Sequence, residues 1–222
     1  MNDHSKSATP QLARNVRRIG RLDIPGGGQV LVQGNHAFVG HMNPPDGTTI
    51  VDVADPANPR VVATIPAHDA KSHTHKVRVA GDIMITNVEM NKRHVLRRGA
   101  AKLGDAEAKL AAALGRKPTD AEIAAEMKGK AGDIPLIREF VAKGYHEGGF
   151  KVWDISDRSK PRLLHHEKTF GFGVHRFDMD EKYAYISTEM EGYVGNILWA
   201  LLALSLIVPA LRAWRRKLKA AT

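Results

Sequence analysis

Two segments one hundred residues apart share one pattern, and this repeat limits the folds open to the chain. Residues 75–85 and 175–186 each begin with His, alternate apolar and polar residues and cross a polar turn. Each resumes as a β-rich run that ends in Glu-Met, at Glu89 and Glu189. Alternation of this kind is typical of a half-buried strand. The repeat therefore predicts two similar β-hairpins, and a third over 29–41 lacks the leading His.

A second repeated unit follows the first along the chain. Residues 47–60 match residues 149–162, and in each a strand ends in Asp-(Val/Ile)-x-Asp before a turn and a Pro-Arg pair. Two successive hairpins make a four-stranded unit, and units of about 40–50 residues are typical of β-propeller blades. We therefore expect a mainly β fold, a partial β-propeller of about two and a half blades, at 28–67, at 73–169 and from His175 onward.

The repeated stretches 49–59 and 153–161 resemble the LVIVD-repeat family, whose members are predicted β-propeller proteins. The resemblance spans roughly residues 20–198 apart from an insert, and it implies a fold without implying an activity. Closed propellers typically have four to eight blades. The family fold therefore implies a truncated arc, completed by further copies of the chain or by a partner protein.

Composition divides the chain into an N-terminal tail, a body and a C-terminal segment. An insert over about 91–146 interrupts the second blade, and apolar residues recur in it at helical spacing up to Leu114. Pro118 can start a second helix, so we expect a helical hairpin. The predicted parts are the tail (1–22), the LVIVD-type blades (23–196) and the membrane segment with its basic tail (197–222).

The C-terminal segment is apolar enough to be a transmembrane helix. Residues 192–211 are uncharged, and a helix of this length reaches roughly 30 Å, the thickness of a bilayer core. Trp214 and several basic residues follow at once, as at a membrane interface. We expect a single-pass membrane protein anchored by 197–211, with a buried core helix as the alternative. The positive-inside tendency favours a cytoplasmic tail, but the N-terminus shows no signal-peptide core, which leaves the membrane side open.

Cysteine content and charge limit which metal ligands and which partners the chain can have. The chain has no Cys, so a metal would be held by His, carboxylate or Met. The net charge is +9, but five of the basic residues lie in the last eleven positions. Aromatic residues make up 6% of the chain, and no basic face carries interleaved aromatic residues. We therefore expect no nucleic-acid partner.

The candidate site residues come from the repeated hairpins. His75 lies seven residues before position 82 and Glu89 seven after it, and His175 and Glu189 flank position 182 in the same way. On an antiparallel hairpin each His would lie almost opposite its Glu, and two adjacent blades would bring both pairs to one rim. The predicted metal ligands are His75, Glu89, His175 and Glu189, and the predicted ligand or anion contacts are His73, Lys76, Arg176 and His41.

These residue types permit three interpretations. Imidazole nitrogen with carboxylate oxygen suits zinc, iron, copper or manganese, so the set predicts a divalent metal ion. The same groups could act as general acid and base, with Lys76 and Arg176 adding affinity for anions. Alternatively, each His–Glu pair pins its own hairpin by a charge-assisted hydrogen bond and binds nothing.

Three hypotheses of function follow from these features. The first is a membrane-tethered binding or scaffold module that presents the insert and the His/Glu rim to a partner. The second is a metal-dependent oxidoreductase or hydrolase that uses the rim histidines. The third is a gene fragment fused to a foreign membrane segment, without a function of its own.

Overall fold

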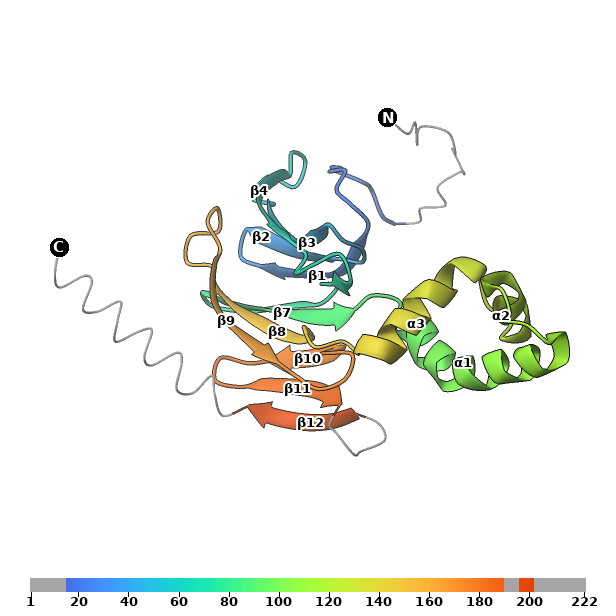
Figure 1. Ribbon diagram of the computed structural model, residues 1–222. Coiled ribbons are helices and arrows are strands. Elements are labelled where there is room, and N and C mark those ends of the chain that lie inside the picture. The colour runs from blue at the N-terminus through green and yellow to red at the C-terminus, as the bar shows by residue number, and fades with distance from the viewer. Residues whose placement is uncertain (1–14, 190–195, 202–222) are drawn as a thin grey trace.

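The computed structural model describes residues 15–189 and 196–201 of the chain, and these form a mainly β fold with three antiparallel sheets and three α-helices (Figure 1). The sheets do not close into a barrel within the described residues. The predicted tail lies outside the described residues up to position 14, and residues 15–22 contain no helix or strand. Sheet 1 consists of β1 (Gly27–Gln33), β2 (His36–His41), β3 (Asp46–Asp52) and β4 (Arg60–Pro66), paired in that order.

The other two sheets follow the same up-and-down order along the chain. In sheet 2 the order is β5, β7, β8, β9, and β6 also pairs with β7. Sheet 2 consists of β5 (Ser72–His73), β6 (Val77–Ala80), β7 (Ile83–Met90), β8 (Gly149–Asp154) and β9 (Arg162–Lys168). Sheet 3 consists of β10 (Arg176–Met179), β11 (Ala184–Glu189) and β12 (Asn196–Leu201).

The repeated Asp and Pro-Arg motif closes the last hairpin of sheets 1 and 2 in the same way. Asp52 accepts a hydrogen bond from the backbone N–H two residues on and lies 2.8 Å from the guanidinium of Arg60, its register partner. Asp154 makes the matching backbone hydrogen bond and lies 3.1 Å from Arg162. The carboxylate thus holds both the turn and the start of the next strand, so the motif's local role was predictable from the sequence.

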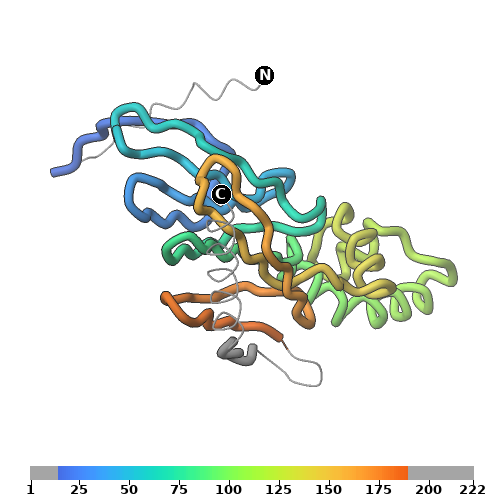
Figure 2. The backbone as a smooth tube through the Cα atoms, turned by 90° about the vertical axis from the view of Figure 1, so that its left-hand side faces the viewer, coloured from blue at the N-terminus to red at the C-terminus, as the bar shows by residue number. Residues whose placement is uncertain are grey.

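The three sheets stack as layers, with sheet 2 in the middle (Figure 2). Successive side chains of a strand point to opposite faces, so β7 and β8 serve two cores. Met84 and Trp153 pack toward sheet 1, whereas their neighbours Ile85 and Val152 pack toward sheet 3. Because both faces of sheet 2 are covered, β7 and β8 are buried along almost their whole length, polar residues included.

One strand from each sheet lies along a common line, namely β1, β6 and β10. Strand β6 lies next to β1 of sheet 1 and also next to β10 of sheet 3. Across β6 and β10, Arg78 Nε donates to Asp178 Oδ1 at 2.8 Å. The segments that precede β6 and β10 are therefore brought close together, and they carry His75 and His175.

The insert between β7 and β8 projects from one side of the sheets (Figures 1 and 2). It contains three helices where we expected a two-helix hairpin, so that prediction was wrong. The third was missed because only two buried apolar positions mark it and no polar side chain caps its start. The elements are α1 (Arg93–Leu114), α2 (Asp120–Glu126), a 3-10 turn (Ala131–Asp133) and α3 (Ile134–Lys143).

Helices α1 and α3 meet closely at Gly99. A Cβ atom at Gly99 would lie 2.4 Å from Ile137 Cδ1 of α3, well inside van der Waals contact. Both residues are buried in the apolar core of the insert. Only glycine leaves room for Ile137, so this position sets the separation of the two helices.

The predicted transmembrane helix is contradicted at its start. Residues 197–201 belong to β12, which pairs with β11 from Glu189↔Asn196 to Ala184↔Leu201. The open edge of β11 needs partners for its backbone N–H and C=O groups, and Ile, Leu and Trp suit a strand as well as a helix. Among the described residues no helix is long and apolar enough to cross a membrane. The rest of the predicted span, 202–211, lies outside the described residues.

The helix crossing predicts opposite effects for two glycines of α1. Gly99→Ala should lower the free energy of unfolding by about 1–3 kcal/mol, because the methyl group overpacks the contact with Ile137. Gly104→Ala is the matched control, since its Cβ would meet nothing within 4 Å, and it should raise helix stability by about 1 kcal/mol. Thermal unfolding followed by far-ultraviolet circular dichroism measures both. Equal shifts for the two variants would contradict the close crossing.

Candidate metal centre

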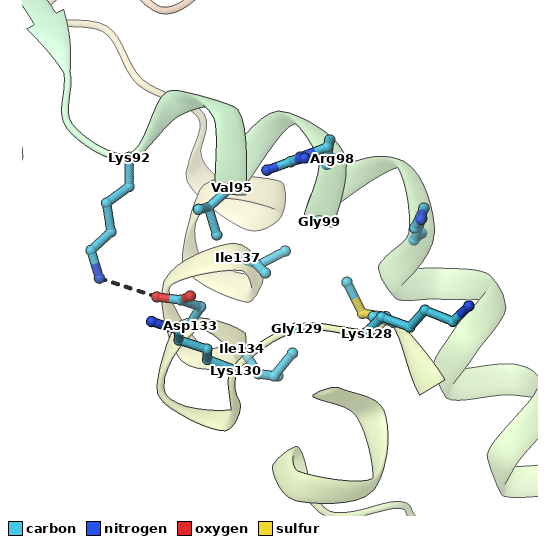
Figure 3. A pocket seen from close by; sticks show the side chains of 12 residues that line it. Lys92, Val95, Arg98, Gly99, Lys128, Gly129, Lys130, Asp133, Ile134 and Ile137 are labelled. Carbon is cyan, nitrogen blue, oxygen red and sulfur yellow. Dashed lines mark hydrogen bonds and ion pairs between the residues drawn. The ribbon is translucent and has the colours of Figure 1, made fainter. Parts of the chain in front are cut away.

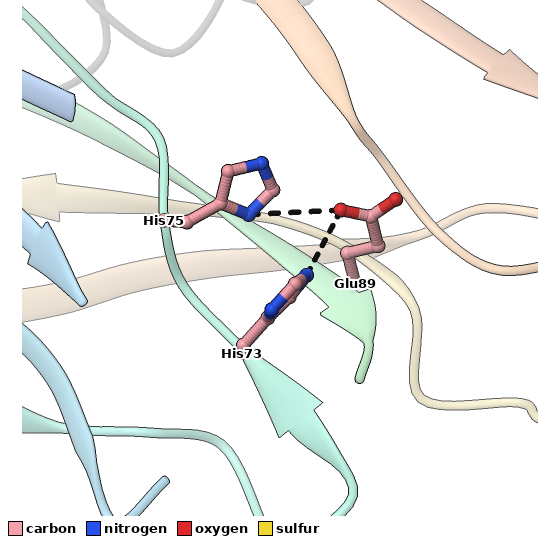
Figure 4. Close-up of side chains that lie close together, drawn as sticks. All are labelled: His73, His75 and Glu89. Atoms are coloured by element: carbon pink, nitrogen blue, oxygen red, sulfur yellow. Dashed lines mark hydrogen bonds and ion pairs between the residues drawn. The ribbon is translucent and has the colours of Figure 1, made fainter. Parts of the chain in front are cut away.

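A buried carboxylate, Glu89, lies at the centre of a group of histidines. It stands near the end of β7, and its side chain is 1% exposed. Its Oε2 atom lies 3.0 Å from His73 Nε2, 2.9 Å from His175 Nδ1 and 3.6 Å from His75 Nδ1. Figure 4 shows the rings of His73 and His75 directed at the same oxygen. Three imidazoles from two sheets thus converge on one atom.

Strand register decides which histidine faces Glu89. His73 of β5 is the register partner of Glu89, whereas His75 lies in the connection between β5 and β6. The hairpin geometry predicted His75 at that position, so the pairing was off by two residues. His175 immediately precedes β10, and its ring centroid lies 5.2 Å from that of His75. The two repeat-equivalent histidines therefore do meet, as expected.

The insert supplies a positive charge next to the Glu89 carboxylate. Arg93, the first residue of α1, places a guanidinium nitrogen 2.8 Å from Glu89 Oε1. The Arg93 side chain is itself mostly buried. We did not identify Arg93 from the sequence, because the predicted helix began later in the insert. Glu89 lies in a strand and Arg93 in the helix that follows, so the spacing rules for residues of one helix gave no signal for this pair.

Sheet 1 supports His75 through its backbone. Gln29 N donates to the His75 carbonyl oxygen at 2.9 Å, so β1 holds this connection directly. A Cβ at Gly40 would lie 2.8 Å from the His75 carbonyl carbon, and one at Gly28 would lie 2.7 Å from its oxygen. Glycine at both positions lets sheet 1 approach the histidine segment. The sequence offered no sign of this role.

Burial and neighbouring groups set the protonation of the site. Burial, followed by the charge of His73, lowers the pKa of His75 from 6.5 to about 3, which leaves this ring neutral at pH 7. Burial alone would raise the pKa of Glu89, but hydrogen bonds from His73 and His175 and the charge of Arg93 outweigh it and lower that pKa. The site therefore presents an ionised carboxylate beside a neutral imidazole, as metal binding requires.

The spacing of the donor atoms suits a small metal ion. Ligand atoms of His73, His75 and Glu89 all lie within 4.8 Å of one another. Two ligands each about 2.1 Å from a tetrahedral zinc ion lie about 3.4 Å apart, close to the N–O separations at Glu89 Oε2. His73 Nδ1 also lies 3.1 Å from the Met42 carbonyl oxygen. When Nδ1 donates to that carbonyl, Nε2 is unprotonated and can bind a metal, the arrangement usual for metal-ligating histidines. A metal at Nε2 would then replace the hydrogen bond that His73 makes to Glu89 in the metal-free chain.

Glu189 does not share this arrangement with His175. Its carboxylate forms an ion pair with Arg97 of α1 and accepts from Phe172 N at 3.4 Å. Strand β10 begins at Arg176, whose register partner is Ser187, so Glu189 lies beyond the residues of β11 that pair with β10. It forms an isolated bridge to Phe170, in the loop before β10. The partner of His175 is therefore Glu89, from the neighbouring repeat.

The remaining predicted contacts lie at different distances from the cluster. His41 is buried in sheet 1, where its ring nitrogens lie 3.1 Å from the Pro25 carbonyl oxygen and 2.7 Å from Thr49 Oγ1. Its role there is structural. Lys76 follows His75, and its charge contributes slightly to lowering the pKa of that histidine. Arg176 is exposed on β10.

Comparison with known families identifies the repeats. Two stretches of the chain, residues 27–65 and 128–169, match the family model of the LVIVD repeat. The first covers nearly all of sheet 1, and the second begins after α2 and includes β8 and β9. No curated protein matches the chain. The match supports the resemblance seen in the sequence, and a repeat of this kind specifies architecture without specifying chemistry.

The metal-free chain should lose stability on acidification through His75. Its pKa is about 3 in the folded state against 6.5 as a free side chain, so the unfolded chain takes up the proton first as pH falls. Stability is therefore complete above pH 6.5 and falls toward pH 3, by roughly 1.4 kcal/mol per pH unit for one group. Urea unfolding between pH 7 and 5 in the presence of EDTA measures the slope.

His75→Gln should remove roughly half of this slope, because burial also lowers the pKa of His166 from 6.5 to about 4 and this second histidine adds a slope of its own. The exposed His165→Gln should keep the slope. Glu89 affects the free energy of unfolding only at lower pH. Its pKa is lower in the folded chain than its normal value of 4.5, so the stability it provides is lost as pH falls below 4.5. An unchanged slope in His75→Gln would show that burial of this ring does not control the pH dependence.

Proposed function

We propose that this chain is a β-propeller-like repeat module that holds a divalent metal ion where its sheets meet. The ligands are His73, His75, His175 and Glu89. The observation that carries the proposal is the convergence of three imidazole nitrogens, at 2.9–3.6 Å, on one buried carboxylate oxygen. The Arg93 guanidinium, which comes from α1, pairs with Glu89 and helps to keep its carboxylate ionised.

The propeller-like architecture is supported by the order of the strands. One strand of each sheet lies beside a strand of the next sheet, as β1, β6 and β10 do. Each sheet continues as an antiparallel meander away from that line. Radially arranged meanders are typical of propellers, and the LVIVD matches agree with this arrangement.

The donor set favours a binding or scaffold role over catalysis. Three nitrogens and one oxygen without thiolate suit zinc, and also iron, copper or manganese. Four protein ligands complete a tetrahedral shell, which is usual for structural sites. A metal here would tie sheet 2 to the segment that leads into sheet 3, so its main effect would be to fix their arrangement.

A metal-dependent hydrolase or oxidoreductase is the second candidate. Such enzymes need an open coordination position for water or substrate. His175 has a side chain 26% exposed, against 12% for His73 and 7% for His75, so it is the ligand nearest to solvent. If His175 left the metal, the coordination position that it vacates would face solvent and could bind water or substrate.

Completion of the propeller by a second copy is a further proposal that rests on the outer face of sheet 1. Val32, Ala37, Val51 and Val61 stand opposite one another in register across the four strands. The two end residues of this row are exposed, Val32 at 61% and Val61 at 48%. In a propeller this face packs against the next blade, and two copies of three sheets fall within the usual range of four to eight.

Membrane attachment through 197–211 is a proposal that rests on the sequence. Strand β12 takes residues 196–201, so ten uncharged residues remain before Arg212. As a helix they would reach about 15 Å, roughly half of a bilayer core. A spanning helix therefore requires residues 197–201 to leave β11.

Metal analysis tests the main proposal. The purified full-length chain, stripped with EDTA and reloaded with zinc, should hold close to one equivalent by inductively coupled plasma mass spectrometry. His73→Ala with His75→Ala should weaken zinc binding by at least about 100-fold, because two of four ligands are lost and loss of a supporting residue alone costs about 10–100-fold. Binding should also weaken as pH falls, since the ligand histidines take up protons.

Two matched variants separate the site from general effects. His165→Ala removes an exposed histidine, and Glu189→Gln changes the repeat-equivalent carboxylate, so both should keep wild-type affinity. Circular dichroism is the check that each variant is folded. A folded wild type that holds no zinc, iron, copper or manganese would overturn the proposal.

Oligomeric state tests the second-copy proposal. Val32→Lys places a charge at an exposed end of this apolar row, whose middle residues Ala37 and Val51 are buried, so it should convert a dimer to a monomer in light scattering after size exclusion. Val141→Lys, an equally apolar and exposed position on α3, is the control that should leave the mass unchanged. A monomeric wild type at all concentrations would contradict the proposal.

A further inference from the structure

The helical insert contains a pocket of its own, away from the histidine cluster. Its volume is about 690 Å³, and it lies between α1, α3 and the segment that follows α2 (Figure 3). Ligand pockets typically have volumes of about 300–1,000 Å³. None of the four proposed metal ligands lines it. A ligand bound here would be separate from the metal proposed above.

The floor of this pocket is apolar. It is formed by Val95 of α1, Ile134 and Ile137 of α3, and Met127 after α2. The two isoleucines belong to the buried core of the insert, and Val95 and Met127 pack against that core. Met side chains adapt to ligands of varied shape. The floor therefore suits a hydrocarbon group.

The rim of the pocket is basic. It carries five cationic side chains and a single carboxylate, Asp133, which lies 3.1 Å from Lys92 Nζ (Figure 3). Among residues 15–189, no carboxylate forms an ion pair with Lys102, Lys128 or Lys130. Arg98 Nε bonds to the His94 carbonyl oxygen and makes no ion pair within the same residues. The rim thus gathers uncompensated positive charge.

The pocket holds several of the basic residues of an otherwise mildly basic body. Five of the basic residues of the chain lie in its last eleven positions, and without them the body is only mildly basic. The pocket cations come from Lys92, the residue before α1, from the first half of α1 and from the segment after α2. Like charges held together repel, and a bound anion removes that repulsion.

We propose that this pocket binds an amphiphilic organic phosphate, with its hydrocarbon group on the apolar floor and its phosphate at the basic rim. A phosphate carries more charge than a carboxylate at pH 7 and accepts several hydrogen bonds at once. The arginine fork and several lysines of the rim match that need. The apolar floor excludes inorganic phosphate as the preferred ligand.

Calorimetric titration of the full-length chain with octyl phosphate, below its micelle concentration, tests the proposal. Binding should be saturable with one site, and at least tenfold tighter than for inorganic phosphate or octyltrimethylammonium. Lys102→Gln with Lys130→Gln should weaken it at least tenfold, because two rim charges are lost. Both lysines are exposed, so the fold should be kept, which circular dichroism checks.

The matched control removes the same charge elsewhere on the insert. Lys117→Gln with Lys143→Gln changes two exposed lysines outside the pocket, and it should keep the affinity for octyl phosphate. Equal weakening in both double variants would mean a general charge effect and would overturn the proposal. So would equal affinity for octyl phosphate and octyltrimethylammonium.

A second arm separates a soluble phosphate ester from a lipid headgroup. Sedimentation with phosphatidylglycerol vesicles, against phosphatidylcholine vesicles, measures attachment to an anionic bilayer. Binding to the anionic vesicles without binding to octyl phosphate would assign the basic rim to a membrane surface and would overturn the pocket proposal. Binding to octyl phosphate that the Lys102 and Lys130 variant loses supports it, whatever the vesicles show.

Discussion

The arrangement of this protein depends on the compensation of one buried charge. An ionised carboxylate removed from water is costly unless it is paired and hydrogen-bonded. Glu89 meets this requirement from three directions, through His73 of its own sheet, His175 of the next sheet and Arg93 of the insert. These contacts join parts of the chain that are distant in sequence. The same convergence creates a set of donors suited to a metal ion.

Duplication explains how the site arose, and divergence explains its asymmetry. Glu89 and Glu189 occupy equivalent positions in the repeat, and each meets an arginine one turn apart on α1, Arg93 or Arg97. Only Glu89 also receives histidines, because a register difference directs Glu189 toward the loop before β10. One inserted helix thus neutralises the carboxylates of two repeats. The insert is therefore an integral part of the core arrangement.

The insert also separates two kinds of chemistry. Its first turn faces the buried histidine cluster through Arg93, whereas Lys92, Val95 and Arg98 line the basic pocket. The neutral imidazole of His75 and the ionised Glu89 suit a metal, and the lysine rim suits a phosphate. Adjacent residues of α1 serve both sites because successive side chains of a helix point about 100° apart.

The sequence by itself determined the features that depend on local pattern. These are the β-hairpin repeat, the Asp and Arg turns of Asp52 and Asp154, the position of the insert and the meeting of His75 with His175. Only the tertiary structure decided that His73 faces Glu89, that Arg93 neutralises it and that 197–201 pair with β11. Register, helix starts and edge pairing depend on contacts between distant segments, and the periodicity of a single segment does not encode them.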